Sequence, residues 1–157
     1  MVHVVEVALL MGLQASGKTT FYRTMLADTH AHVSKDAFPN ARSKQRRQML
    51  LIGEALAAGQ HVAVDNTNPS PEEWHPIITA ARSQLAKVTG YWFPPELSAS
   101  LSRNAAREGK ARIPDVGLYA THQRLQRPSL ADGFDELFVV RIDRDGGFDV
   151  RPMDEDT

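Results

Sequence analysis

The sequence lacks cysteine, long hydrophobic runs and a strong net charge, and each absence excludes a class of protein. Without cysteine, neither disulfide bonds nor thiolate metal sites can form. No hydrophobic run approaches the roughly 18 residues needed to span a bilayer. A formal net charge of −1 argues against a uniformly basic surface that coats nucleic acid. We therefore expect a cytoplasmic protein with no membrane partner.

The composition is that of a globular protein. A chain of 157 residues with 42% hydrophobic content is long enough to bury one core and too short for two typical domains. We expect the folded domain to span residues 1–145 and the acidic residues 146–157 to form a flexible tail. The histidines have no metal-binding spacing and are interpreted as surface or structural residues: His3, His30, His32, His61, His75 and His122.

A glycine-rich segment follows the first hydrophobic run. Residues 12–20, "GLQASGKTT", match the pattern GxxxxGK[ST], and they join a predicted buried strand to a predicted helix. In that context backbone amides and a helix N-terminus bind phosphate oxygens. Lys18 is expected to bridge the β- and γ-phosphates and Thr19 to hold Mg²⁺. The expected ATP-binding residues of this loop are Gly12, Ala15, Ser16, Gly17, Lys18, Thr19 and Thr20.

Short hydrophobic segments alternate with helical patterns along the chain. The predicted strands are residues 4–11, 30–34, 61–65, 87–93 and 136–142. The predicted helices are residues 18–27, 43–58, 71–82, 95–107 and 115–126. This order predicts an α/β fold of the P-loop NTPase type, with a parallel sheet of about five strands flanked by helices.

Two polar positions follow predicted strands and are candidates for acceptor chemistry. Asp36 comes after the second strand, at the sheet edge where ligands bind in this fold, and its carboxylate can take a proton from an attacking hydroxyl. Asp65 ends the third strand, and Asn66 stands where ATP-hydrolysing motors usually have a water-activating glutamate. We expect Asp65 and Asn66 to position an acceptor. The alternatives are a turn aspartate at position 36 and a simple turn before Pro69.

Basic residues gather in two segments of this otherwise neutral chain. Arg103 and Arg107 lie four residues apart on one helix face beside a short loop, which is typical of a lid that closes over polyphosphate and excludes water. Residues 35–47 include Arg42, Arg46 and Arg47 and indicate a local anionic site. The alternative interpretation of either segment is a solvated helix surface.

Five segments, taken in order, resemble the P-loop kinase domain of the polynucleotide 5′-hydroxyl kinase family. They are "GLQASGKTTF", "VSKDAF", "VAVDNTNPS", "RNAAREGKARIP" and "RPSLADGFDEL". By that resemblance Asp36 is the general base, Arg103 and Arg107 are lid arginines, and Arg42 falls near a basic residue that contacts the acceptor strand. Some members carry an arginine three residues after the aspartate, where this chain has Pro39.

The resemblance implies a magnesium-dependent kinase that transfers the γ-phosphate of ATP to the 5′-hydroxyl of DNA or RNA, as in the repair of nucleic-acid ends. Relatives often carry a fused phosphatase or ligase, for which 157 residues leave no room, so any such partner is expected to be a separate protein. Two alternatives stay open. One is a kinase of a nucleoside, sugar or antibiotic, and the other is a nucleotide-dependent binding module without transfer activity.

Overall fold

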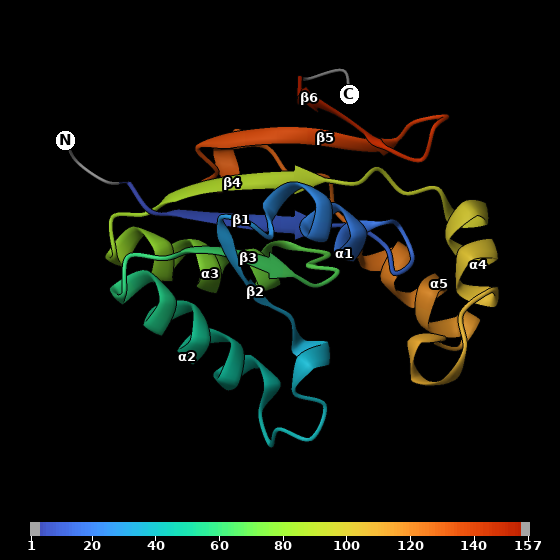
Figure 1. The fold of residues 1–157 in the computed structure, drawn as a ribbon, viewed down its shortest axis with the longest axis horizontal. Helices are drawn as coiled ribbons and strands as arrows, with labels where there is room; N and C mark the ends of the chain where they lie inside the picture. The colour runs from blue at the N-terminus through green and yellow to red at the C-terminus, as the bar shows by residue number, and fades with distance from the viewer. Residues whose placement is uncertain (1–3, 155–157) are drawn as a thin grey trace.

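A six-stranded sheet forms the centre of the protein, whose computed structural model describes residues 4–154 (Figure 1). The strands, in the spatial order β2-β3-β1-β4-β5-β6, are Glu6–Met11 (β1), His30–Val33 (β2), His61–Asp65 (β3), Lys87–Trp92 (β4), Glu136–Ile142 (β5) and Phe148–Pro152 (β6). The P-loop NTPase-like α/β class predicted from the sequence is confirmed. His3 and the last three residues of the predicted tail lie outside the described residues.

Five helices connect and cover the strands. They are Lys18–Phe21 (α1), Lys44–Ala57 (α2), Pro71–Ser83 (α3), Leu97–Ala105 (α4) and Asp115–Arg124 (α5), within the part of the chain that the structure describes. A π-helical turn, Tyr22–Leu26 (η1), continues α1, and single turns occur at Lys35–Ala37 (η2), Gly109–Ala111 (η3) and Leu130–Asp132 (η4). Figure 1 shows α2 and α3 together beside the sheet, while α4 and α5 lie beyond the end of its strands.

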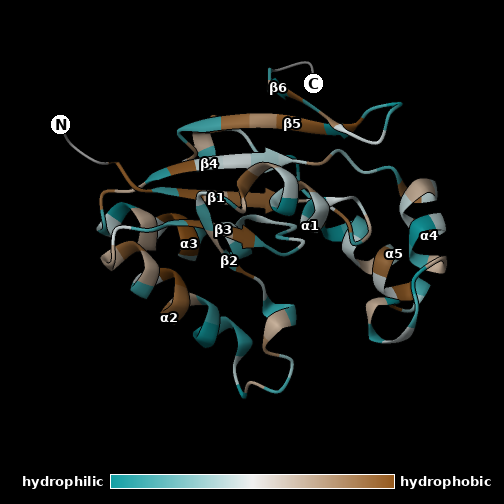
Figure 2. Cartoon of the chain, in the orientation of Figure 1, coloured by the Kyte–Doolittle hydropathy of each residue, from teal (hydrophilic) through white to brown (hydrophobic). Residues whose placement is uncertain are grey.

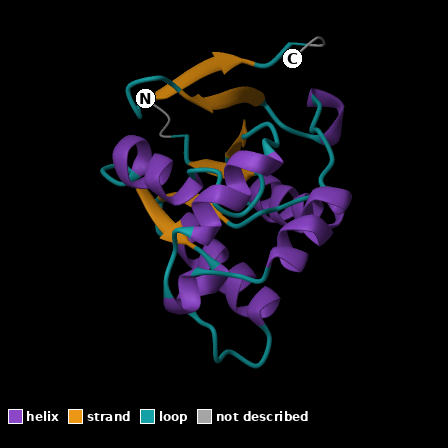
Figure 3. Ribbon diagram, turned by 90° about the vertical axis from the view of Figure 1, so that its right-hand side faces the viewer, coloured by secondary structure: helices purple, strands orange, loops and turns teal. Residues whose placement is uncertain are grey.

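The C-terminal segment differs from the sequence prediction. The first five strands are parallel, but β6 pairs antiparallel with β5, so the sheet is mixed (Figure 3). A flexible tail is therefore wrong for Phe148–Pro152, and the boundary predicted after residue 145 falls in the β5–β6 turn. The physical reason is burial: Phe148 packs edge-on against Phe21 of α1, with 5.3 Å between ring centroids.

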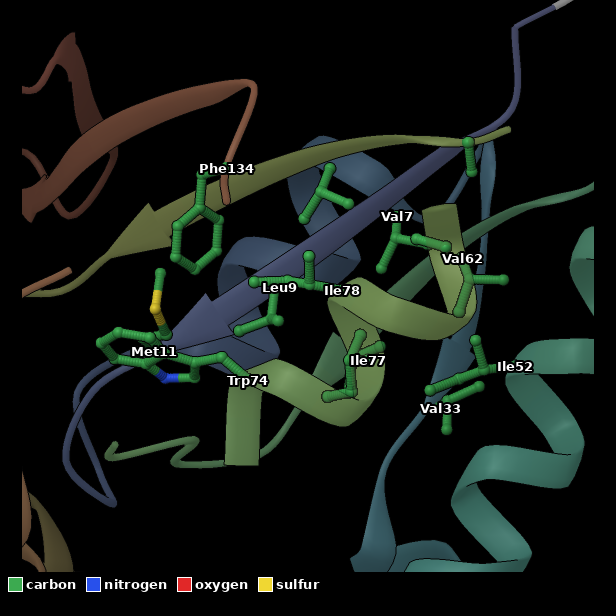
Figure 4. Close-up of a cluster of buried hydrophobic side chains, with 14 of the residues drawn as sticks. Val7, Leu9, Met11, Val33, Ile52, Val62, Trp74, Ile77, Ile78 and Phe134 are labelled. Atoms are coloured by element: carbon green, nitrogen blue, oxygen red, sulfur yellow. The ribbon is translucent and has the colours of Figure 1, made fainter. Parts of the chain in front are cut away.

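Side chains that alternate along β1 divide the hydrophobic core between the two sheet faces. Val7, Leu9 and Met11 face α2 and α3, where Trp74 and Ile77 pack against them (Figure 4). Residues 8 and 10 face the opposite way, toward α1 and η1. Burial on both faces explains why β1 and β3 are nearly continuous hydrophobic runs, largely brown in Figure 2.

Gly90 of β4 shows how tightly the sheet packs. A Cβ atom at this position would lie 2.5 Å from Leu137 Cδ2 and 2.9 Å from Met11 Cε. We expect Gly90→Ala to lower the free energy of unfolding by about 1–3 kcal/mol, because the core must shift to admit the methyl group. Gly53→Ala in α2 is the control, since no atom lies within 4 Å of its Cβ position, and it should stabilise by about 0.5–1 kcal/mol. Urea unfolding measures both, and equal effects would contradict this account.

The parallel order brings polar residues to one edge of the sheet. β1, β2 and β3 all end at this edge, so the segments that follow them converge there. The candidate site therefore lies at the carboxyl ends of these strands.

Among the described residues, no helix combines the length and the hydrophobicity that crossing a membrane requires.

Candidate active site

The loop between β1 and α1 has the backbone of a phosphate cradle. Gly17 has a φ of 97°, which favours glycine, and Ala15 also has a positive φ of 57°. Gly12 lies against Phe93, which directly follows β4, and a Cβ at position 12 would come within 2.8 Å of Phe93 Cβ. Residues 14–20 line a cavity at the carboxyl edge of the sheet, together with Asp36, residues 65–67 and Arg107. Most of the predicted site residues therefore meet at one cavity.

Lys18 is buried at the base of this cavity. Its Nζ donates to the carbonyl oxygens of Gly12 at 3.0 Å and Leu13 at 2.5 Å. The pKa of Lys18 is lowered to about 8, mainly by burial and in part by the Arg107 guanidinium, while the carboxylates of Asp65 and Asp36 oppose the shift. Because the ammonium is buried, its charge acts more strongly on a phosphate that enters than it would in bulk water.

Thr19 and Asp65 form the polar contact expected of a magnesium site. Thr19 Oγ1 donates to Asp65 Oδ2 at 2.8 Å, although the two residues are 46 positions apart. Asp65 is buried, and both residues line the cavity. A hydroxyl that gives its proton to a carboxylate keeps its lone pairs for a cation. The oxygen donors suit Mg²⁺, so these residues fit the metal that the sequence predicts.

Asp36 lies in η2, in a turn that polar side chains hold in place. Asp36 N donates to Ser34 Oγ at 3.3 Å, and Lys35 N donates to Asn66 Oδ1 at 2.9 Å. Asn66 Nδ2 in turn donates to Gln48 Oε1 at 2.7 Å. The Asn66 carboxamide is thus engaged at both ends by the chain itself, and its contacts support the turn that carries Asp36.

The two predicted lid arginines lie near different parts of the phosphate loop. The prediction that they share one helix face is wrong, because Arg103 belongs to α4 whereas Arg107 lies beyond its end at Ala105. Arg107 lines the main cavity, whereas Arg103 lines a neighbouring hollow with Ser16 and Ile142. Arg103 Nη1 donates to the carbonyl of Ala15 at 3.2 Å. The buried Asn104 exchanges two hydrogen bonds with the backbone of Ile113, at 2.7 and 3.0 Å, and so closes the loop after α4.

Arg42 does not line the main cavity. It borders a separate, open hollow with Arg46, Arg47, Met49 and Leu50, beside the hydrophilic first turns of α2 (Figure 2). These arginines are exposed, and Leu50 is 51% exposed. Residues 38–41 connect the turn that bears Asp36 to the segment that carries these arginines.

Sequence reasoning missed several polar residues at the site. His32, interpreted as a surface or structural histidine, donates from Nε2 to Asp65 Oδ2 at 2.8 Å. Gln48 and Asn104 are 1% and 0% exposed and hold the turn and the lid loop. The available signal was a polar residue at an otherwise buried helix position, which indicates a specific hydrogen-bond partner.

Solved structures of several proteins share this fold at low sequence identity. A gluconokinase from Sinorhizobium meliloti is 17% identical with a TM-score of 0.65, over 91% of this chain and 86% of that one. A fungal RNA kinase is 17% identical with a TM-score of 0.70, over 90% and 77%. Kti12 from Chaetomium thermophilum, in complex with ADP-AlF3, is 14% identical with a TM-score of 0.69, over 89% and 92%.

These likenesses establish a P-loop kinase-like fold. A family model also matches this chain, over residues 7–128, which is more than half of its length. The matched residues include the phosphate loop, the Asp36 turn, the end of β3 and the loop after α4. The chain belongs to the family described as an AAA domain.

Proposed function

We propose that this protein is an ATP-dependent phosphotransferase that acts on the 5′-hydroxyl end of DNA or RNA. The observation that carries the proposal is the shared cavity, since a carboxylate able to act as a base lines it together with the phosphate loop and a lid arginine. A nucleotide switch without transfer activity has no need of Asp36 at that position. The fungal RNA kinase likeness agrees with the proposal in fold.

On the donor side, the chain binds and neutralises the triphosphate. The amides of residues 15–20 and the start of α1 receive the phosphates, and Lys18 contacts the β- and γ-phosphates. Arg103 and Arg107 neutralise charge that spreads onto the transferred phosphoryl group. Mg²⁺, when bound by Thr19 with Asp65 behind it, supplies further neutralisation of the β- and γ-oxygens.

On the acceptor side, Asp36 is the group that takes a proton. The hydroxyl oxygen attacks the γ-phosphorus, the bond from that phosphorus to the bridging oxygen of ADP breaks, and the hydroxyl proton passes to the Asp36 carboxylate. Ser34 and Asn66 hold the turn from behind through its backbone amides. Catalysis then consists mainly of positioning and charge stabilisation.

Arginines in α2 and just before it favour a nucleic-acid acceptor over a small molecule. A small molecule fits within one cavity, whereas Arg42, Arg46 and Arg47 form an exposed basic group outside it. Contacts to successive backbone phosphates use such a group without reading bases. The gluconokinase likeness keeps a sugar acceptor as the second candidate, since that protein shares the fold of this chain.

The test is incubation with γ-labelled ATP, Mg²⁺ and short oligonucleotides. We expect label on oligonucleotides with a 5′-hydroxyl and none on the same oligonucleotides with a 5′-phosphate. A panel of sugars and nucleosides runs in parallel. Transfer to a member of that panel, with none to any oligonucleotide, would assign the small-molecule function instead. Absence of transfer to every acceptor would contradict both.

Replacing Arg42, Arg46 and Arg47 together by alanine should raise the acceptor KM and leave the KM for ATP unchanged. Each contact to a single-strand phosphate adds about 0.7 to the slope of log KM against log salt concentration. Three contacts therefore account for about a 20-fold rise in KM between roughly 50 and 200 mM salt. The variant should lose that share of the salt dependence. The control replaces Arg23, Arg144 and Arg151, which are exposed elsewhere. Equal salt slopes in both variants would mean that these three arginines do not contact the acceptor.

A further inference from the structure

One buried carboxylate oxygen at the site accepts two hydrogen bonds from distant parts of the chain. Asp65 Oδ2 lies 2.8 Å from Thr19 Oγ1 of α1 and 2.8 Å from His32 Nε2 of β2. An ionised carboxylate only accepts, so the imidazole must carry its proton on Nε2. His32 is therefore a donor, and it reaches the carboxylate that orients the Thr19 hydroxyl.

The ring of His32 is held flat against a neighbour. Tyr22 of η1 stacks on it, with centroids 4.2 Å apart and an angle of 11° between the planes. Tyr22 is itself fixed, because its hydroxyl donates to the carbonyl of His30 at 2.6 Å. Its ring is buried, whereas a third of the His32 side chain is exposed. The stack restricts rotation of the imidazole and keeps Nε2 directed at Asp65.

We propose that His32 is a positioning residue that fixes the Asp65 carboxylate so that the Thr19 oxygen faces the cavity and can bind a divalent cation. This inference rests on the proposed ATP·Mg²⁺ site and extends that site to His32 on β2, an edge strand of the sheet. A carboxylate with one donor can rotate about its Cβ–Cγ bond. A second donor on the same oxygen removes that freedom, and groups behind a metal ligand commonly affect metal affinity by about 10–100-fold.

Three variants separate the hydrogen bond from the ring. His32→Phe keeps a ring against Tyr22 and loses the donor. His32→Gln loses the ring and keeps an N–H that can reach Asp65. His30→Gln is the matched control, because His30 lies two residues earlier on the same strand and pairs with Glu6 at 2.8 Å instead of Asp65. His32→Ala replaces the phenylalanine variant if that variant does not fold.

The measurement is the affinity for Mn²⁺ in the presence of saturating ADP, followed by the electron paramagnetic resonance signal of free Mn²⁺. We expect His32→Phe to weaken Mn²⁺ binding about 10–100-fold, His32→Gln to recover most of it, and His30→Gln to match the parent. Affinity for ADP in EDTA should stay the same in all of them. Activity should show the same loss as a raised Mg²⁺ requirement, with a near-parental kcat at saturating Mg²⁺.

The proposal is overturned if folded His32→Phe binds Mn²⁺ as the parent does, if His32→Gln is no better than His32→Phe, or if the parent binds no Mn²⁺ with ADP. None of these measurements uses an acceptor. A protein that binds Mn²⁺ as expected and phosphorylates no oligonucleotide would therefore contradict the proposed function and leave the role of His32 supported.

Discussion

Asp36→Asn is expected to lower kcat about 10²- to 10⁴-fold while ATP still binds. The substitution keeps the size of the side chain and removes its capacity to accept a proton. Asp36 is exposed and its turn is held through backbone amides, so the fold should not change. Single-turnover transfer at saturating ATP and acceptor isolates the chemical step, with circular dichroism as the check on folding.

Asp28→Asn is the matched control for this variant. Asp28 is exposed and precedes β2, while Asp36 follows the same strand at the cavity end. Transfer by Asp28→Asn should equal that of the parent protein. If folded Asp36→Asn transferred phosphate at a near-parental rate, Asp36 would not be the base, and a nucleotide switch or another acceptor would be the better interpretation.

Lys18→Met should lower kcat about 10²- to 10³-fold and weaken ATP binding, because it removes the buried charge that we propose contacts the phosphates. The methionine keeps the length of the side chain and fills the same space. Lys87→Met, at the opposite edge of the sheet, is the control. Loss of kcat with unchanged affinity would mean that Lys18 acts only in the transition state, and unchanged kinetics would exclude it from the site.

The lowered pKa of Lys18 gives this binding a defined pH dependence. In the proposed site the phosphates bind the charged ammonium, and with a pKa of about 8 the free protein holds that charge below pH 8 and loses it above. Above pH 8 binding must therefore take up a proton, so the Kd for ATP should rise about 10-fold between pH 7 and pH 9. Calorimetry at these pH values checks the slope. Lys18→Met should show no such rise, and a flat profile in the parent would contradict the lowered pKa.

Local sequence patterns predicted most of the fold and the phosphate loop of the candidate site. The strands from β1 to β5 could be predicted because each is a short hydrophobic run bounded by turn residues, and a parallel sheet buries both of its faces. The phosphate loop could be predicted because its glycines and Lys18 lie within nine consecutive residues. In such cases the physical constraint acts between neighbours in the chain, so the sequence records it directly.

Other features depend on which distant segments meet, and only the tertiary structure decided them. β6 has charged residues at alternate positions and becomes a strand only because β5 offers an open edge and Phe21 a surface for Phe148. Asn66 supports the turn of Asp36 because β2 and β3 are neighbours. The same neighbour relation, with β3 beside β1, brings His32, Asp65 and Thr19 together across 33 and 46 positions. Hydrogen bonds of this kind follow from strand order, and hydrophobic periodicity does not encode strand order.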